Sequence, residues 1–119
     1  MNADCLLNKR AELKIRIAQL PVKPDIIAVV EVKAKNCNEF PLLSEFTMEG
    51  YEVHSVNLNT EYGRGVILYT ALWMKVSPYS PDGPELDSLW LLMKLNDKDK
   101  LILGCVYRSP SSSVKIMST

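Results

Sequence analysis

The chain has 119 residues, of which 47% are hydrophobic and 24% charged, a balance typical of one small globular domain and not of a disordered chain. Fourteen basic residues balance fourteen acidic ones, which argues against a protein that coats nucleic acid through a general positive charge but leaves room for a nuclease with a local basic surface. Three widely spaced cysteines and one histidine argue against structural zinc and indicate a reduced, intracellular compartment. No apolar stretch is long enough to span a bilayer and no signal pattern opens the chain, so we expect a soluble protein with no membrane partner.

The first expected element is a helix, because apolar side chains recur at helical spacing: Leu6, Leu13, Ile17 and Leu20. Pro21 and Pro24 end this helix and force an extended lead into a strand that begins at Ile26. A helix followed by a strand is typical of the second half of a β-α-β unit. No strand precedes this helix in the sequence, so the first half of the unit is expected to be missing.

The strand over 26–30 is a continuous apolar run that ends in one carboxylate, Glu31. The run lacks alternation, which predicts a strand covered on both faces. Burying such aliphatic side chains is worth roughly 1.5–3 kcal/mol each, so the strand is firmly anchored. A rigid strand that presents an acid at its end suits a metal site, although Glu31 is also the residue at which a solvated loop would begin.

The remainder of the chain predicts a short helix and several mostly antiparallel strands, which suggests a mixed sheet layered with helices in an α/β (α+β) domain. A short helix is expected at 41–46, a strand with one wet face at 51–56, a buried strand at 66–70, a loop at 78–84, and a hairpin of strands 89–95 and 101–107. The pattern is lost from Ser109 onward, and residues 114–119 are expected to be a frayed tail.

Four segments of this chain are similar to a known family when taken together: Asn2-Ala3-Asp4, Ile27-Ala28-Val29-Val30-Glu31-Val32-Lys33, Arg64-Gly65-Val66-Ile67-Leu68-Tyr69-Thr70 and Val106-Tyr107-Arg108-Ser109-Pro110. Their order and spacing resemble the N-terminal half of the endonuclease domain of LINE-type (non-long-terminal-repeat) retrotransposons, within the endonuclease/exonuclease/phosphatase family. The resemblance covers residues 1–113. It implies a partial four-layer α/β-sandwich of the DNase I-like type, with Mg²⁺ as cofactor and DNA as partner. It also implies a parent protein that carries the C-terminal half of the domain and a reverse transcriptase.

The resemblance assigns a metal-site role to Glu31 as the Mg²⁺ ligand, since Mg²⁺ is held by one or two carboxylates together with water and phosphate oxygens. Asn2 matches a family asparagine that would hold water or a phosphate oxygen, and an ordinary helix N-cap is the alternative. Tyr107 matches a tyrosine whose hydroxyl contacts the scissile phosphate, although a tyrosine that ends a core strand needs no such role.

Further resemblance concerns the segment after Tyr107. Arg108 could meet phosphate through its guanidinium fork, or it could be a solvated arginine. Ser111 stands where relatives have asparagine, and a hydroxyl offers only one donor with less reach. The Arg64-Gly65 pair is expected to serve a tight entry into the next strand, and His54 is expected to be a surface or half-buried residue with no catalytic part.

The family motifs that follow in relatives, an aspartate-x-asparagine pair and a serine-aspartate-histidine triplet, do not occur in this sequence. Since those motifs supply the general base and much of the transition-state stabilisation, we expect no catalysis from this chain alone. The first hypothesis is therefore a fragment of a Mg²⁺-dependent DNA endonuclease. The alternatives are a non-catalytic remnant of a decayed element and, more remotely, a small α/β binding module of the receiver type, whose strand-ending aspartate and lysine are not found here.

Overall fold

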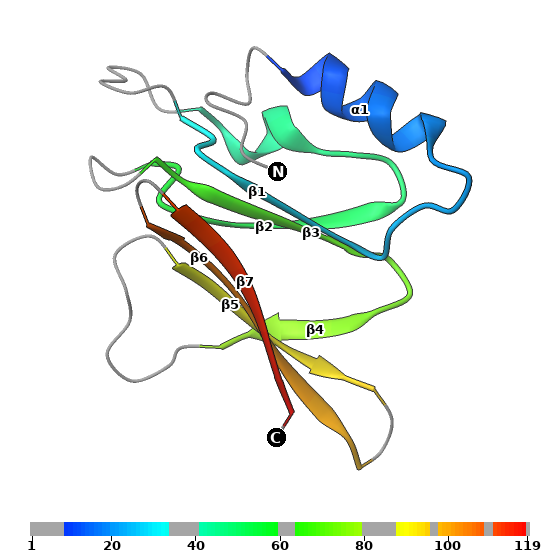
Figure 1. Cartoon of the computed structure of the whole chain (residues 1–119), viewed down its shortest axis with the longest axis vertical. Coiled ribbons are helices and arrows are strands. Elements are labelled where there is room, and N and C mark those ends of the chain that lie inside the picture. The colour runs from blue at the N-terminus through cyan, green and yellow to red at the C-terminus, as the bar shows by residue number, and fades with distance from the viewer. Residues whose placement is uncertain are drawn as a thin grey trace.

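A computed structural model of the chain describes residues 9–33, 41–59, 64–79, 88–95, 98–108 and 111–118, and its description of side chains ends at Val106. One α-helix, one short 3-10 helix and seven strands follow one another in the described ranges (Figure 1). They are α1 (Arg10–Gln19), β1 (Ile26–Val30), η2 (Leu43–Phe46), β2 (Tyr51–Val56), β3 (Val66–Ala71), β4 (Lys75–Pro78), β5 (Ser88–Lys94), β6 (Lys100–Arg108) and β7 (Ser111–Ser118).

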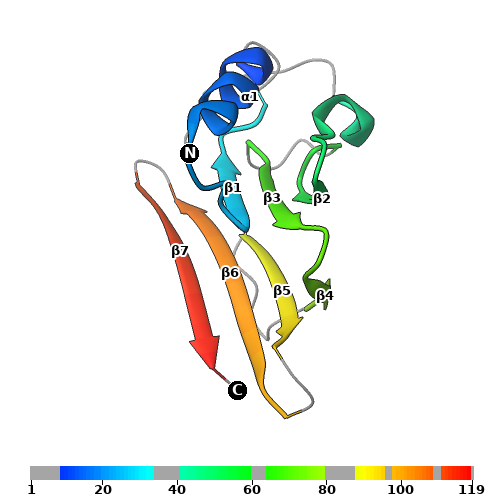
Figure 2. The same cartoon turned by 90° about the vertical axis from the view of Figure 1, so that its right-hand side faces the viewer.

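The strands form two antiparallel sheets. The first sheet has three strands in the order β1-β3-β2, and the second has four in the order β4-β5-β6-β7. In the first sheet β3 is central, and its residue Val66 lies opposite both Val30 of β1 and Val56 of β2. The second sheet is a meander in which each strand pairs with the next along the chain. Figure 2 shows the two sheets as separate layers with α1 beyond the first.

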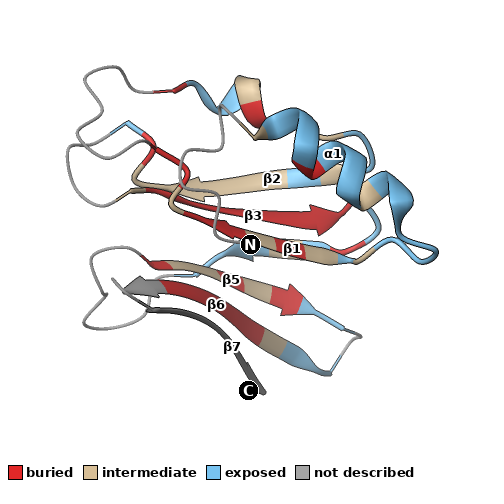
Figure 3. Ribbon diagram, turned by 45° about the horizontal axis from the view of Figure 1, so that its top comes forward, coloured by how far each residue is buried: buried red, intermediate tan, exposed pale blue. Residues whose placement is uncertain are grey.

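The first sheet is covered on both faces, which explains the unbroken apolar sequences of β1 and β3. One hydrophobic core lies between this sheet and the helices α1 and η2, and includes Leu13, Ile27, Val29, Phe46, Ile67 and Tyr69. A second core lies between the two sheets and includes Val30, Val66, Leu68, Leu91, Leu103 and Cys105. Figure 3 shows the resulting order of layers, in which every residue of β3 is buried.

Most elements expected from the sequence are present. The structure confirms the helix, the buried strands β1 and β3, the strand β2 with one solvent-exposed face, and the β5–β6 hairpin. The expected short helix is the 3-10 turn η2. Cys105, expected to be a small core residue, is a buried free thiol. The structure is thus an α+β domain, with one helix of ten residues and seven strands in the described ranges.

Three features differ from the expectation. The sheet was expected to be mixed, but every described strand pair is antiparallel, so that expectation was wrong. Strand β4 was not expected, because it has only four residues and ends in proline, which is tolerated at a sheet edge. The frayed tail is instead β7, whose residues pair with β6 from Ser111 opposite Arg108 to Ser118 opposite Leu101. Main-chain hydrogen bonding to a neighbouring strand needs no apolar pattern, so the sequence carried little sign of it.

The helix α1 is short and mostly exposed, and only Leu13 is fully buried within it. No helix in the described part of the chain is long and apolar enough to cross a membrane.

Candidate functional site

The candidate site lies at one end of the strands of the first sheet, where β1 and β2 end and β3 begins. Val30, Val66 and Val56 lie side by side at these strand ends, because Val66 pairs with both of the others. Glu31 therefore emerges from the sheet beside the segment that enters β3. The strand β1 is buried at its last two residues, so the sheet holds the backbone that carries Glu31 rigidly.

Glu31 is set apart by its backbone and by its partial burial. Its φ is 56°, in the left-handed region that non-glycine residues seldom adopt. Its side chain is only 13% exposed, and its Oε1 lies 3.2 Å from Nη1 of Arg64, whose side chain is 22% exposed. Strained backbone of this kind costs about 1–3 kcal/mol and persists where the surroundings impose it, often at functional sites. Glu31 begins a loop, as the alternative interpretation expected, but its side chain is only partly exposed.

Arg64 is held in place by main-chain contacts as well as by Glu31. Its Nε donates a hydrogen bond to the carbonyl oxygen of Lys33 at 3.2 Å. The Lys33 amide donates to the Arg64 carbonyl oxygen at 2.7 Å, and the Val32 amide donates to the Gly65 carbonyl oxygen at 3.4 Å. The segment after β1 and the segment before β3 thus continue to pair beyond the strands, and this pairing sets Arg64 beside Glu31.

Gly65 makes this arrangement possible. Its φ is +82°, and a Cβ at this position would lie 3.3 Å from Leu58 Cδ2 and 3.4 Å from the Asn57 carbonyl oxygen. Only glycine fits both the left-handed backbone and the close approach. The expectation that Arg64-Gly65 forms a tight entry into a buried strand is confirmed. The ion pair between Arg64 and Glu31 was missed, because nothing in a sequence indicates which of fourteen basic side chains reaches a given carboxylate.

The other predicted site residues are described only in part. Asn2 lies outside the described residues. Tyr107 and Arg108 are the last residues of β6, and Ser111 is the first of β7, with Arg108 opposite Ser111, but their side chains lie outside the description. Figures 1 and 2 show the adjoining ends of β6 and β7 on the same side of the molecule as the end of β1. The backbone thus brings Tyr107, Arg108 and Ser111 to the same side as Glu31.

A divalent ion beside Glu31 would find few protein ligands. Within the described ranges no group of three or more His, Cys, Asp or Glu side chains could hold a metal. Glu31 offers one carboxylate, the kind of hard oxygen ligand that Mg²⁺ takes, and Mg²⁺ sites often need only one or two from the protein. Arg64 places one positive charge beside this carboxylate and competes with a metal ion for it. The described residues thus supply one carboxylate at this position, and a Mg²⁺ ion here would need its remaining ligands from water and phosphate oxygens.

His54 does not belong to this site. It is half-buried on β2, and its Nε2 lies 3.0 Å from Oγ1 of Thr70 on the neighbouring strand. Burial lowers the pKa of His54, and the nearby Glu52 carboxylate acts in the opposite direction. The expectation that His54 is a half-buried residue is confirmed.

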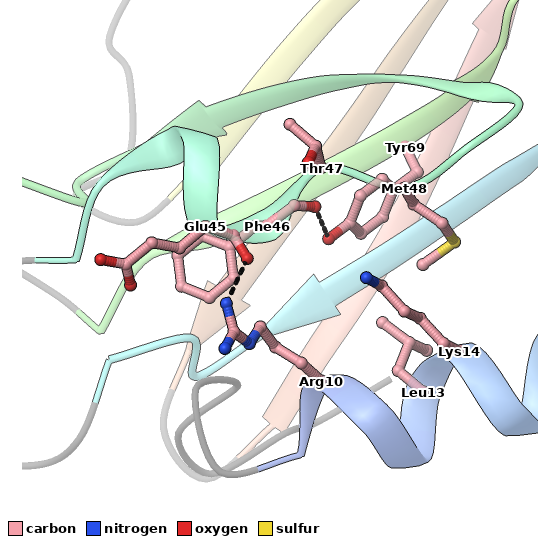
Figure 4. Close-up of a pocket in the computed structure, with 8 residues that line it drawn as sticks. All are labelled: Arg10, Leu13, Lys14, Glu45, Phe46, Thr47, Met48 and Tyr69. Carbon is pink, nitrogen blue, oxygen red and sulfur yellow. Dashed lines mark hydrogen bonds between the residues drawn. The ribbon is translucent and has the colours of Figure 1, made fainter.

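A second concave site, between α1 and η2, is a structural junction (Figure 4). Arg10 Nη1 donates to the Glu45 carbonyl oxygen at 2.8 Å, and the Tyr69 hydroxyl donates to the Phe46 carbonyl oxygen at 2.6 Å. Burial raises the pKa of Tyr69 to about 12. The cavity measures about 10 Å³, roughly the space of one water molecule. The side chains here satisfy the carbonyls of a 3-10 turn and leave no room for a ligand.

Comparisons of this chain with protein-family models, with curated proteins and with solved structures give no match.

Proposed function

We propose that this chain is the N-terminal part of a Mg²⁺-dependent DNA endonuclease of the endonuclease/exonuclease/phosphatase family, in the LINE-type retrotransposon branch, and that it does not cut DNA by itself. The observation that carries the proposal is Glu31, a partly buried carboxylate with left-handed backbone at the end of a strand covered on both faces. The four sequence segments that resemble the family, one of which contains Glu31, also support it.

The described residues suggest a division of roles. Mg²⁺, when bound, would stabilise negative charge on the phosphate and on the leaving oxygen. Glu31 would be its protein ligand, and Arg64 would be a positioning residue that holds one carboxylate oxygen. Tyr107, Arg108 and Ser111, on the same side of the fold, would contact the phosphate, and Asn2 would hold a water molecule or a phosphate oxygen.

The layer order is consistent with the finer fold assignment. A helix layer, the first sheet and the second sheet follow one another. A DNase I-like sandwich would add a fourth layer on the outer face of the second sheet. We propose that the C-terminal half of the domain supplies this layer in the parent protein.

A metal-binding measurement on the intact chain tests the site without requiring catalysis. We expect Mn²⁺, a paramagnetic substitute for Mg²⁺, to broaden the NMR signals of residues near Glu31. Glu31→Gln should abolish this effect, whereas Glu49→Gln, which removes an exposed carboxylate, should leave it intact. Equal broadening in wild type and Glu31→Gln would rule out the assignment of Glu31 as the ligand.

A nicking assay tests the activity. Supercoiled plasmid incubated with the chain should stay intact with Mg²⁺ as with chelator, because the sequence lacks the motifs that supply the general base. Metal-dependent nicking that Glu31→Gln abolishes would show an active enzyme and contradict this part of the proposal.

The alternative is a non-catalytic remnant of a decayed element, and one observation favours it: the ion pair with Arg64 gives Glu31 a structural role that needs no metal. Long-read sequencing of the transcript separates the two. A frame that continues upstream into an apolar strand and downstream into the missing motifs supports the endonuclease. Stop codons that bracket Met1 and Thr119 support the remnant.

A further inference from the structure

The main chain of β2 is hydrogen-bonded along only one of its two edges. β2 is the last strand of the first sheet, and among the described strands it pairs with β3 alone. In an antiparallel pair, directly opposite residues alternate between exchanging two main-chain hydrogen bonds and exchanging none. The Leu72 amide donates to the opposite Gly50 carbonyl oxygen at 3.3 Å, so this pair is of the bonded kind. Counted in twos along β2, the residues that bond to β3 are therefore Glu52, His54 and Val56.

The residues between them turn their main-chain groups away from β3. Tyr51 agrees with this alternation, because its amide donates outside the ladder, to the Met48 carbonyl oxygen at 3.2 Å. Val53 and Ser55 have no other hydrogen bond within the described residues, and both are partly exposed. Two amides and two carbonyl oxygens thus point outward from the centre of the strand, in the spacing that a further strand would match.

This edge lacks the features that usually prevent strand addition. Proteins protect exposed edges with very short strands, lysine or proline. β4, an edge of the second sheet, has four residues, begins with Lys75 and ends with Pro78. β2 has six residues and contains neither lysine nor proline. Of these two edges, β2 is therefore the one open to another strand.

The edge stays open in the parent protein proposed above. An upstream strand would form a β-α-β unit with α1 and β1, so we expect it beside β1, at the opposite edge of the sheet. The C-terminal half of the domain would cover the outer face of the second sheet, to which β2 does not belong.

The helix side of the edge suits apolar side chains. Val53 packs against the core on this side of the sheet, and an added strand would place every second side chain there. η2 stands over the β2 margin of the sheet on the same side (Figure 2). Leu43 of η2 is 39% exposed, and Leu42, directly before it, is 65% exposed.

The other side of the edge is polar. Glu52 is exposed, and His54 is half-buried beside Thr70. Lys75 lines one groove with Glu52, although no ion pair joins the two. Since both signs of charge are present, this side suits polar side chains of either charge. An extended segment that is apolar on one face and polar on the other therefore fits the edge.

A second copy of this chain fits the edge less well. Antiparallel pairing of two β2 strands requires a two-fold axis between them. Each copy's η2 stands over its own β2 margin, so the two η2 turns would meet above that axis (Figure 2). A single extended segment meets no such obstacle.

We propose that the outer edge of β2 binds an amphipathic extended segment of another protein, which adds a fourth strand to the first sheet. The main chain of the segment would exchange hydrogen bonds with Val53 and Ser55, and its apolar side chains would lie beneath η2. The inference goes beyond the proposed function, and it rests on neither Glu31 nor a divalent ion.

Solvent exchange of backbone amides, measured by NMR on the intact chain in chelator, tests the proposal. The probe is a short blocked peptide of alternating valine and threonine. At saturation we expect it to slow the exchange of the Val53 and Ser55 amides at least about tenfold. The His54 amide is an internal control, because it already bonds to β3 and its exchange should not change.

Variants of the chain test each part of the edge. Val53→Pro removes an outward donor but no bond to β3, and proline is tolerated at a sheet edge in this orientation, so it should abolish the protection of Ser55. Leu42→Ser should weaken binding about fivefold, whereas Val22→Ser, which removes another exposed apolar side chain, should bind like wild type. Glu31→Gln should also bind like wild type, so a failure of the metal site and a failure of the edge are distinguishable.

Two control peptides need no variant of the protein. A peptide with proline at its centre and a peptide with threonine in place of valine should both fail to protect the two amides. Equal protection by the proline peptide would overturn strand addition, and so would unchanged exchange at the solubility limit of the probe. Slow exchange of both amides without peptide would mean that this chain covers its own edge. Slowing that depends on protein concentration would mean that a second copy covers it, and either result would overturn the proposal.

Discussion

The ion pair between Glu31 and Arg64 makes the sharpest prediction, because it joins stability to the candidate site. Glu31→Gln keeps the size of the side chain and removes its charge. The guanidinium then loses its partner at 3.2 Å while it stays only 22% exposed. Loss of one partner from a fully buried pair costs about 3–5 kcal/mol, and an exposed pair is worth at most about 1 kcal/mol. For this intermediate burial we expect Glu31→Gln to lower the free energy of unfolding by about 2 kcal/mol.

Thermal and urea unfolding measure this loss. For a chain of this length about 2 kcal/mol corresponds to a fall in Tm of about 8 °C. The cause is tested by a double-mutant cycle with Arg64→Met. If the pair is responsible, Arg64→Met should cost at least about 1 kcal/mol less in the Glu31→Gln background than in wild type.

A matched variant separates charge from backbone strain. Glu31→Asn removes the same charge, but asparagine adopts the left-handed region more readily than glutamine or glutamate. With φ at 56°, Glu31→Asn should therefore be less destabilising than Glu31→Gln, although it is the larger change in shape. Strictly additive effects in the cycle, or a larger loss for Glu31→Asn, would refute the reasoning about this site.

The remaining predictions concern the packing of the sheets. A Cβ on Gly104 would lie 2.3 Å from the ring of Trp90, so Gly104→Ala should lower the free energy of unfolding in denaturant by about 1–3 kcal/mol. In a Trp90→Leu background the same change should be neutral or stabilising. Equal losses in both backgrounds would contradict the contact. Tyr69→Phe should cost about 1–2 kcal/mol, because it leaves the buried Phe46 carbonyl oxygen without its donor, and a change below about 0.5 kcal/mol would argue against that hydrogen bond. The wild type should also lose stability as the pH rises above 10, because the pKa of Tyr69 is about 12 in the fold and 10 when unfolded, and Tyr69→Phe should reduce this loss. The lowered pKa of His54 gives the opposite dependence of stability on pH, because the unfolded chain binds the proton more tightly than the folded chain does. Urea unfolding should therefore show stability falling as the pH drops through 6.5. A pH profile in His54→Gln as steep as that of wild type would show that another group causes the effect.

The candidate site could be predicted only in part. Glu31 was identified because an apolar run ends at a carboxylate, which is a local signal. Its partner Arg64 was not, since that contact depends on how the ends of β1 and β3 pair across a long stretch of chain. The left-handed backbone of Glu31 could not be predicted either, because glutamate has no preference for that conformation. Gly65 was the part of this arrangement that could be predicted, because a glycine before a buried strand indicates a close approach of two chain segments.

The sequence by itself determined the local elements: the buried strands β1 and β3, the β5–β6 hairpin, the helix α1 and the turn at Gly65. Apolar runs, turn residues and helical spacing act over a few neighbouring residues, so they can be read along the chain. The tertiary structure alone decided the antiparallel pairing of both sheets, the use of β4 and β7 as edge strands, and the partner of Glu31. It also decided the register that places Lys75, Lys94 and Lys100 opposite one another on three adjacent strands. Each of these features relates segments that are far apart along the chain. Such pairings depend on which faces can be buried together and on main-chain hydrogen bonds, and these bonds do not distinguish one side chain from another.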